Sequence, residues 1–439
     1  MPTTAPAAHT DPPRCPFANG RPYDPLTVAA AEDPQPWLAA ARSSAPVFHH
    51  EPLDLYVVTR HADILAVLRD PATFSSRYAN KFKPMDSPAL RAAFPHGHPG
   101  LRAMTLTDPP AHSRIRRLAN VALTPAAVAR TEPAMRRRCA RLVDGFAGDG
   151  EADLMARYSA PMTVLMITDL AGLPDSLDLD LHQWARDYFA LTLGAPALTD
   201  AAERAVAERA VRMTAFLTDF VEERRATPRD DLISALLAAR TPEGDAALTT
   251  AEVIAVLNSL LVAGVETTSV FLPMLLRELL RHPEQWAAVR ADPALLPAAV
   301  EEGLRHQSTA RGVRRTATRD TEIAGVPIPA GKDVFLTYAS ANYDEAVFEE
   351  PGRFDIHRAR PDRHLSFGKG IHYCIGAPLA RLQSVVAVRT VLDRLPGLRL
   401  VEREIEWLPH MTLPRPARVR FAWDPVPVEL AAGPGGVAQ

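Results

Sequence analysis

One short stretch of the sequence decides how the whole chain is interpreted: Phe367-Gly368-Lys369-Gly370-Ile371-His372-Tyr373-Cys374-Ile375-Gly376-Ala377-Pro378. Its glycines Gly368 and Gly370 permit backbone conformations that a side chain would block, and Gly376 leaves room just behind Cys374. A helix is predicted directly afterwards, because Pro378 falls in the first turn, where its missing amide donor costs little. Unpaired amides at that helix end favour a thiolate over a thiol. A lone thiolate held in this way suits the axial position of haem iron.

The alternative is that Cys374 is an inert core residue, as most cysteines are. The order Phe-Gly-x-Gly-x-His-x-Cys-x-Gly, followed by Ala-Pro-Leu-Ala-Arg, argues against it. This stretch resembles the haem-binding loop of the cytochrome P450 family, the haem-thiolate monooxygenases. The resemblance implies that Cys374 is the iron ligand and that Phe367 and Gly368 lie against the cofactor.

The chain has 439 residues, with no linker-like stretch in its middle and no evident repeat. Apolar segments of helical period run from about Pro36 to Arg394. We therefore predict one haem domain over residues 25–424. The Pro-rich residues 1–24 and the Gly-, Ala- and Pro-rich tail 425–439 are expected to be loosely ordered and flexible.

The three cysteines, Cys15, Cys139 and Cys374, supply neither a disulfide framework nor a zinc site, which fits a reducing cytoplasm. The net charge of −3 gives no general attraction to nucleic acid. Residues 1–6 lack the basic start and apolar core of a signal peptide, and the apolar run 253–265 is too short to span a bilayer. We expect a cytoplasmic protein that binds neither nucleic acid nor a membrane.

The segment 253–268 is apolar almost all round, which predicts a helix buried through the core. The Thr267 hydroxyl can bond the Ala263 carbonyl and bend or widen the helix, and Gly264 lets a flat ligand approach. Alternatively, Thr267 only satisfies itself, and Glu266 is paired or reaches solvent. The order Ala-Gly-Val-Glu-Thr-Thr resembles the distal-helix signature of the family. This implies that Ala263 and Gly264 lie against the haem and that Glu266 and Thr267 deliver protons during oxygen activation.

Glu302 and Arg305 lie three residues apart on one predicted helix face and can form an ion pair. An ordinary exposed pair would contribute only a few tenths of a kcal/mol, roughly. Glu-x-x-Arg also resembles the buried structural pair of the family, which an arginine in Pro351-Gly352-Arg353-Phe354 completes. The resemblance therefore implies that Glu302, Arg305 and Arg353 fix the scaffold behind the cysteine.

His112 and Arg116 are four residues apart and share a helix face. One such pair is usually a solvated surface, but the two propionates of haem need charge-assisted donors. The pair resembles the His-x-x-x-Arg element that supplies these donors in the family. By the same resemblance, Arg315 and His372 are further propionate donors.

The residues that line the substrate pocket are also inferred from the resemblance: Val262, Ala310, Arg311, Met411 and Thr412. Arg311 stands where an apolar residue is common in the family. If it points inward, it can hold an acidic group of the substrate; if it points outward, it joins Arg314 in a solvated or propionate-side cluster. The outward orientation is favoured, because an unpaired buried guanidinium is costly.

Five motifs occur in the order of the family, so the expected fold is the cytochrome P450 fold, a helical triangular prism that is mainly α with small β-sheet regions. Residues 398–401 and 418–421 are strand-like. The resemblance implies one haem b (iron protoporphyrin IX) per chain and a monooxygenase that inserts one atom of O2 into a small organic substrate by hydroxylation, epoxidation or O-dealkylation, in secondary metabolism or catabolism.

Electrons must come from a separate ferredoxin and an NAD(P)H-dependent ferredoxin reductase, because the chain has no flavin or iron-sulfur module. Lys369, Arg381, Arg114 and Arg117 are candidates for a basic rim that receives the ferredoxin. The alternatives are a peroxide-driven haem oxygenase and a non-catalytic haem-thiolate protein that binds a ligand. The intact pair Glu266-Thr267 argues against both.

Overall fold

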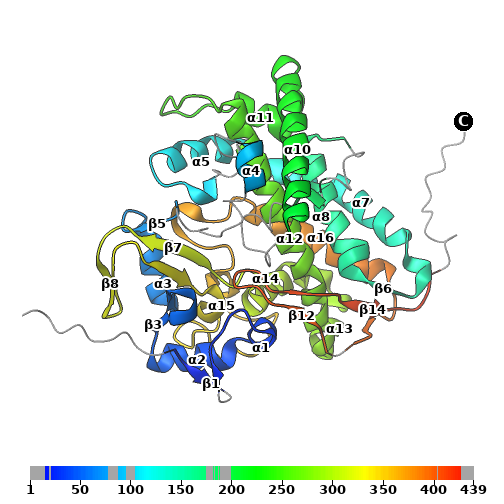
Figure 1. Cartoon of the computed structure of the whole chain (residues 1–439). Coiled ribbons are helices and arrows are strands. Elements are labelled where there is room, and N and C mark those ends of the chain that lie inside the picture. Colours follow the sequence, from blue (N-terminus) through cyan, green and yellow to red (C-terminus); the bar gives the residue numbers. More distant parts are fainter. Residues whose placement is uncertain are drawn as a thin grey trace, which may run out of the picture.

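The computed structural model describes residues 15–18, 21–77, 88–94, 104–174, 181, 183–185, 187, 199–402 and 404–426. Helices dominate this part of the chain, and short strands gather mainly on one side of it (Figure 1). The helices are α1 Val28–Glu32, α2 Gln35–Ser44, α3 His61–Arg69, α4 Pro88–Ala93, α5 Ala111–Ala122, α6 Pro125–Ala129, α7 Glu132–Asp144, α8 Ala160–Ala171, α10 Asp200–Ala226, α11 Leu232–Ala238, α12 Thr250–Arg281, α13 Pro283–Ala291, α14 Leu296–Gln307, α15 Tyr338–Ala341 and α16 Ala377–Arg394.

A five-stranded sheet has the order β3-β4-β10-β7-β5. Its strands are β3 Val47–His50, β4 Leu55–Val58, β5 Phe74–Ser75, β7 Val313–Ala317 and β10 Asp333–Leu336. β10 pairs parallel with β4 and antiparallel with β7, so distant parts of the chain meet in one sheet. α2 and α3 lie on this side of the molecule (Figure 1).

The remaining strands form small antiparallel sheets. They are β1 Phe17–Ala18 with β2 Arg21–Pro22, β8 Thr321–Ile323 with β9 Val326–Ile328, β12 Trp407–Leu408 with β13 Arg415–Pro416, and β11 Arg399–Leu400 with β14 Arg420–Ala422 and β6 Glu151–Asp153. The strand-like character predicted for 398–401 and 418–421 is therefore confirmed by β11 and β14.

The structure describes part of both terminal segments that the sequence predicts to be loosely ordered. In the N-terminal segment, β1 pairs with β2, and Tyr23 is buried; residues 1–14 and 19–20 lie outside the described part. At the other end, the Val426 amide donates to the Ala147 carbonyl at 3.2 Å, while 427–439 lie outside the described part.

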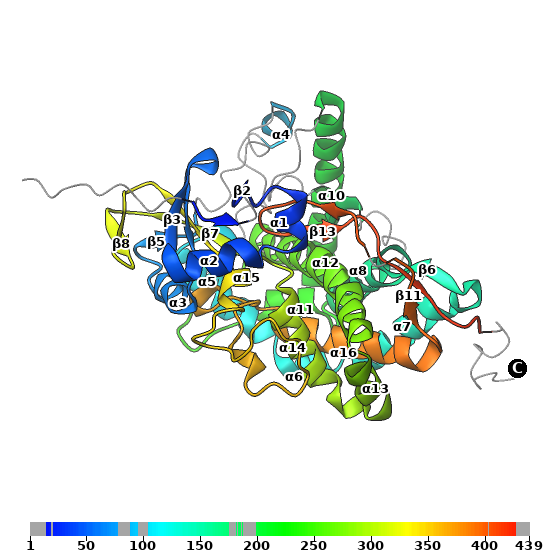
Figure 2. The ribbon, with the colours of Figure 1, turned by 90° about the horizontal axis from the view of Figure 1, so that it is seen from below.

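α12 begins with a capping box, in which the Thr249 side chain accepts from the Glu252 amide and the Glu252 side chain accepts in return. By length and composition it is the one described helix apolar enough to cross a membrane, yet 78% of its apolar window is buried inside the structure. α8 packs against it (Figure 2). Its hydropathy is thus that of a core helix, because it buries most of its circumference against other helices.

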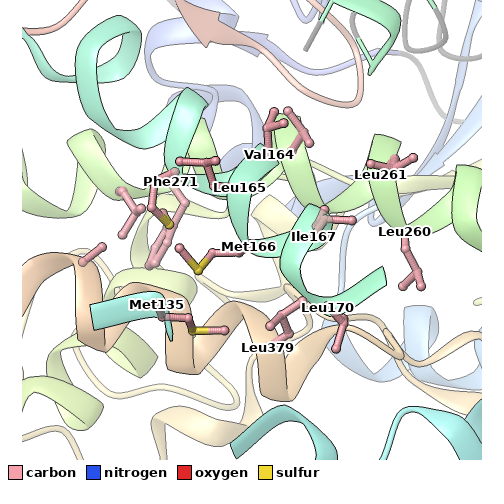
Figure 3. Close-up of a cluster of buried hydrophobic side chains, with 14 of the residues drawn as sticks. Met135, Val164, Leu165, Met166, Ile167, Leu170, Leu260, Leu261, Phe271 and Leu379 are labelled. Atoms are coloured by element: carbon pink, nitrogen blue, oxygen red, sulfur yellow. The ribbon is translucent and has the colours of Figure 1, made fainter. Parts of the chain in front are cut away.

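The main hydrophobic core lies where α8 meets α12, α16 and α7. Figure 3 shows Met166 and Ile167 of α8 among side chains that include Leu260, Leu379 and Met135. All of these residues are buried to more than nine-tenths of their surface. The packing of these side chains therefore holds α12 and α16 against each other.

Glu302 and Arg305 are fully buried and form a two-point ion pair, with Nε–Oε2 and Nη2–Oε1 distances of 2.8 Å. Arg305 Nη1 also donates to the Asn342 carbonyl at 2.9 Å and to the Pro351 carbonyl at 2.8 Å. This pair therefore holds the irregular segment that follows α15 against α14.

The prediction that the Arg353 side chain completes this pair is wrong. Arg353 is 62% exposed and pairs with Glu350 at 3.3 Å and Asp355 at 3.7 Å. Arg358 instead places its Nε 3.1 Å from both carboxylate oxygens of Glu302. Arg353 contributes only its backbone carbonyl, which accepts from Arg358 Nη2 at 2.6 Å.

Glu301, the neighbour of Glu302, connects α14 to the cysteine loop. Arg381 of α16 donates from Nη2 to its carboxylate at 3.0 Å, and His364 Nε2 lies 3.3 Å from the same oxygen. The Arg381 guanidinium also stacks 4.6 Å from the centre of the Phe367 ring. Burial would raise the pKa of Glu301, but hydrogen bonds from His364 and Arg381 lower it to about 2.

Removing Arg358 should destabilise the protein strongly. In Arg358→Ala, Glu302 loses a charge partner in a fully buried position, so the free energy of unfolding should fall by about 3–5 kcal/mol. Arg353→Ala is the matched control and should change it by less than about 0.5 kcal/mol. Urea titration of both variants checks this, and equal losses would contradict the assignment of Arg358.

The charge of Glu301 should make the free energy of unfolding depend on pH in the acidic range. Its folded pKa lies below the ordinary value of 4.5, so its contribution is present above that value and is lost as the pH falls toward about 2. The difference in unfolding free energy between the wild type and Glu301→Gln should therefore shrink between pH 5 and pH 3, measured by urea titration. The exposed Glu284→Gln is the control. A difference independent of pH would refute the role of the Glu301 charge.

Candidate functional site

The cysteine loop is folded by its glycines and by one hydrogen bond across its base. Gly368 and Gly370 have φ values of +66° and +72°, which other residues rarely adopt. A Cβ at Gly370 would lie 2.4 Å from the Leu68 carbonyl oxygen at the end of α3. The Cys374 amide donates to the Phe367 carbonyl at 2.9 Å, which closes the loop.

The reason inferred for Gly376 does not hold in this structure. A Cβ there would lie 3.9 Å from the Cys374 sulfur, an ordinary contact distance, and α16 begins directly afterwards at Ala377. Burial raises the pKa of the Cys374 thiol, while the Gly376 amide and the Arg116 charge act in the opposite direction. The helix end thus opposes the protonated form, and a coordinated cation would complete the deprotonation.

Two histidines meet beside this loop. The ring centres of His112 on α5 and His372 lie 4.2 Å apart. Both ring nitrogens of His112 are buried and have no hydrogen-bond partner in the described structure. His372 Nε2 lies 2.9 Å from the Ser76 hydroxyl, and Asp108 fixes Ser76 by accepting from its amide at 2.8 Å.

Arg116 and Arg315 add positive charge to these histidines. Burial, together with Arg315, His112 and Arg116, lowers the pKa of His372 to about 3. Burial also lowers the pKa of Arg116 and of Arg315, and neither forms an ion pair with another described residue. Four donors thus crowd together without a carboxylate bound to them, which is an arrangement that two acidic groups would stabilise.

The sheet determines where Arg315 lies. Arg315 and Arg314 are neighbours on β7, so their side chains leave opposite faces. Arg315 lies within electrostatic range of Asp108 and Tyr338, whereas Arg314 Nη2 contacts the Met411 sulfur at 3.5 Å. Because side chains alternate along the strand, Arg315, the predicted propionate donor, leaves the opposite face of the sheet from Arg314.

α12 has one open face. Ala263 is exposed and Thr267 is half-buried, although Val262, Glu266 and Thr268 beside them are buried. The Thr267 hydroxyl donates to the Ala263 carbonyl at 2.5 Å, as its spacing predicts. The helix is α-helical throughout, so the expected widening does not occur. Glu266 is buried beside Thr267.

Gly264 serves packing between helices. A Cβ at this position would lie 2.7 Å from the Ile167 side chain of α8. The missing side chain therefore lets α8 approach α12, and the flat-ligand explanation for this glycine is wrong. Ala263, not Gly264, is the residue on the open face.

The substrate-pocket candidates do not all come together. Val262 is buried in the main core, and Met411 is buried in a second cluster with Tyr23 and Trp37. The Thr412 carbonyl accepts from the Arg311 amide at 2.7 Å. The Arg311 guanidinium donates to the Ala31 carbonyl of α1 at 2.8 Å, so it takes neither the inward nor the outward orientation considered from the sequence. The half-buried Ala310 precedes it.

Sequence reasoning missed Ser76 and Asp108, which hold His372 and follow no periodic pattern that would have revealed them. The donors present fit a haem: one thiol in a closed loop, and beside it a crowded group of cationic and imidazole donors that includes an unpartnered histidine. The described residues contain no group of three or more His, Cys, Asp or Glu that could hold a metal ion.

Comparisons with known proteins agree with this chemistry. Residues 181–396 match the family model described as Cytochrome P450. The chain is 37% identical over 376 residues to erythromycin C-12 hydroxylase of Saccharopolyspora erythraea, covering 85% of this chain and 90% of that protein. It is 36% identical over 391 residues to cyclomarin C epoxidase CymV of Salinispora arenicola, covering 88% and 95%.

Solved structures are similar over almost the whole chain. The cytochrome P450 CREJ in complex with (4-ethylphenyl) dihydrogen phosphate is 34% identical, with a TM-score of 0.83, over 92% of this chain and 99% of that one. The Tepidiphilus thermophilus P450 heme domain is 30% identical, with a TM-score of 0.83, over 92% and 97%. With the predicted fold confirmed in this way, the chain belongs to the cytochrome P450 family, the haem-thiolate monooxygenases.

Proposed function

We propose that residues 25–424 form a single domain that holds one haem b, with Cys374 as the iron ligand and with His112, Arg116, Arg315 and His372 at the propionates. The observation that carries this proposal is the crowding of these donors beside the thiol, with both nitrogens of His112 unpartnered. Two propionates would supply the missing acceptors and the negative charge.

When bound, the haem supplies the activation of O2 for insertion into an organic substrate. The chain supplies the proton handling. The Thr267 hydroxyl donates to the Ala263 carbonyl, which leaves its oxygen lone pairs facing the open side of α12 as acceptors. Glu266, the next residue, is buried and carries the carboxyl group for the same task. Phe367, Gly368 and Ala263 would line the cofactor space.

The acid and the alcohol favour O2 over peroxide as the oxidant, because a peroxide-driven enzyme needs no delivery of protons to O2. The relatives whose names state a reaction include a hydroxylase and an epoxidase. We therefore propose hydroxylation or epoxidation of a small organic molecule in bacterial secondary metabolism. The cytoplasm is the proposed location.

Electrons are proposed to come from a separate ferredoxin and an NAD(P)H-dependent reductase. The basic rim expected for this docking is largely neutralised within the chain. Arg114 pairs with Glu252, and Arg381 pairs with Glu301. Arg117 pairs with Asp245 at 2.7 Å, and this bond is the main cause that lowers the pKa of Asp245 to about 2. Of the four predicted residues, Lys369 alone remains exposed without an ion pair in the described structure.

The thiolate assignment is tested by the absorption spectrum of the reduced protein with carbon monoxide. The wild type should give the red-shifted thiolate band. Cys374→Ser should lose that band, because an alcohol is a far poorer electron donor than a thiolate. Cys139→Ser is the matched control and should keep it. Retention of the band in Cys374→Ser would overturn the assignment.

The proposed role of Thr267 in proton delivery is tested by measuring how much of the NAD(P)H consumed yields product and how much yields hydrogen peroxide. Thr267→Ala should bind haem normally, yet in a ferredoxin-driven assay it should release more hydrogen peroxide for each NAD(P)H consumed. Product formation should fall roughly a hundredfold or more, the lower end of the range for a general acid. Thr268→Ala, changed at the next position, should keep the wild-type ratio. An unchanged peroxide ratio in Thr267→Ala would remove its proposed role.

A further inference from the structure

A cleft of about 890 Å³ lies beside α1 and the C-terminal half of α12. Its apolar wall comes from Trp37, Val270, Met274 and Trp407, which belong to α2, α12 and β12. α1 and β12 are neighbours in this region (Figure 1). Cys374, His112 and Thr267 do not line the cleft, so it is distinct from the haem site. Its volume is typical of a pocket for a small organic ligand.

The cleft follows the open face of α12 toward its C-terminal end. Val270, Met274 and Arg277 continue the face of Thr267 at helical spacing. Arg277 lies ten residues beyond Thr267, about 15 Å along the helix axis. The part of the cleft beside Arg277 therefore lies well away from Thr267, the residue proposed to take part in proton delivery.

Arg311 is the uncompensated charge of this cleft. Its guanidinium makes one hydrogen bond, from Nη2 to the Ala31 carbonyl at 2.8 Å. Its Nε is buried without a partner, and it forms no ion pair with any described residue. A buried guanidinium N–H without an acceptor is costly. Burial accordingly lowers the pKa of Arg311.

Two further lining residues carry unused hydrogen-bonding atoms. Arg277 bonds Glu278 through Nη1 at 3.0 Å, but its Nε is buried without a partner. His306 bonds the Gly352 carbonyl through Nε2 at 3.2 Å, and its Nδ1 has no partner.

By contrast, the buried carboxylate that lines the cleft, that of Glu278, already has charged partners. Glu278 is paired with both Arg277 and Arg281, and the more exposed Glu345 is paired with Arg42. Glu32 and Asp33 lie exposed at the rim. The carboxylates that line the cleft are therefore paired or exposed, whereas Arg311 has no carboxylate partner among the described residues.

We propose that this cleft binds a small organic acid, whose carboxylate pairs with Arg311 and whose apolar body lies against Trp37 and Trp407. The site is additional to the haem pocket and does not depend on the proposed monooxygenase reaction. One guanidinium group can bind a carboxylate through two parallel charge-assisted hydrogen bonds. The tryptophan rings supply a large apolar contact area.

The test uses the haem-loaded full chain and 4-fluorophenylacetate, observed by fluorine NMR. 4-Phenylimidazole is added to saturation, so that the haem iron and the space above it are filled. The acid should still bind, without further change in the haem absorption spectrum. Its neutral analogue, 4-fluorophenylacetamide, should bind about ten- to a hundredfold more weakly, because it lacks the charge.

Arg311→Leu should weaken binding of the acid by about tenfold or more. Arg290→Leu, on the exposed face of α13, is the matched control and should leave binding unchanged. Folding of each variant is checked by its melting temperature and by the carbon monoxide spectrum. If Arg311→Leu does not fold, the comparison of the acid with the amide and the competition experiment on the wild type still decide the outcome.

Four results would overturn the proposal. Displacement of the acid by 4-phenylimidazole would place it in the haem pocket. Equal binding of the acid and the amide would show that charge does not hold it, and binding unaffected by Arg311→Leu would show that Arg311 does not hold it. No binding at millimolar concentration would mean that the cleft holds only water. The carbon monoxide spectrum tests the haem assignment separately, so a failure here is distinguishable from a failure there.

Discussion

The burial of the Glu302 carboxylate on α14, next to the partly buried Glu301, is the constraint on which the region around the cysteine depends. Glu302 is fully buried, so its charge must be matched by Arg305 and Arg358, and Arg305 holds the segment that contains Asn342 and Pro351. Glu301 holds Arg381 at the start of α16. One turn of helix therefore positions both the loops before the cysteine and the helix after it. Loss of one partner would leave an uncompensated charge, which is why such pairs are costly to break.

The sequence predicted best where contacts are local. The bonds between Thr267 and Ala263 and between Glu302 and Arg305 join residues four and three apart on one helix, a geometry that the helix itself dictates. The cysteine loop was predictable because positive φ values at Gly368 and Gly370 require glycine. The mainly helical fold followed from the periodicity of the apolar residues and from the order of the motifs.

Predictions failed where a choice depended on tertiary contacts. Arg353 and Arg358 are five residues apart in irregular structure, and no period in the sequence says which of them points inward. Gly264 was attributed to a ligand, but its neighbour is Ile167, which is distant in the sequence. For Arg311 the sequence suggests an orientation toward the substrate or toward a solvated or propionate-side cluster with Arg314, whereas its acceptor is the carbonyl of Ala31 on α1. Ser76 and His372 are 296 residues apart in the sequence. Sequence spacing carries no information about such pairs.

The parallel pairing of β4 with β10 has a consequence for biosynthesis. β4 is made early, but the strand beside it ends at Leu336, so the central sheet cannot close until most of the chain has left the ribosome. At bacterial rates of elongation this delay is on the order of tens of seconds. During that time, the apolar β4, Leu55–Val58, has an unpaired edge, which is the kind of segment that associates with other chains. The nascent N-terminal part of this protein is therefore expected to depend on chaperones until β10 is available.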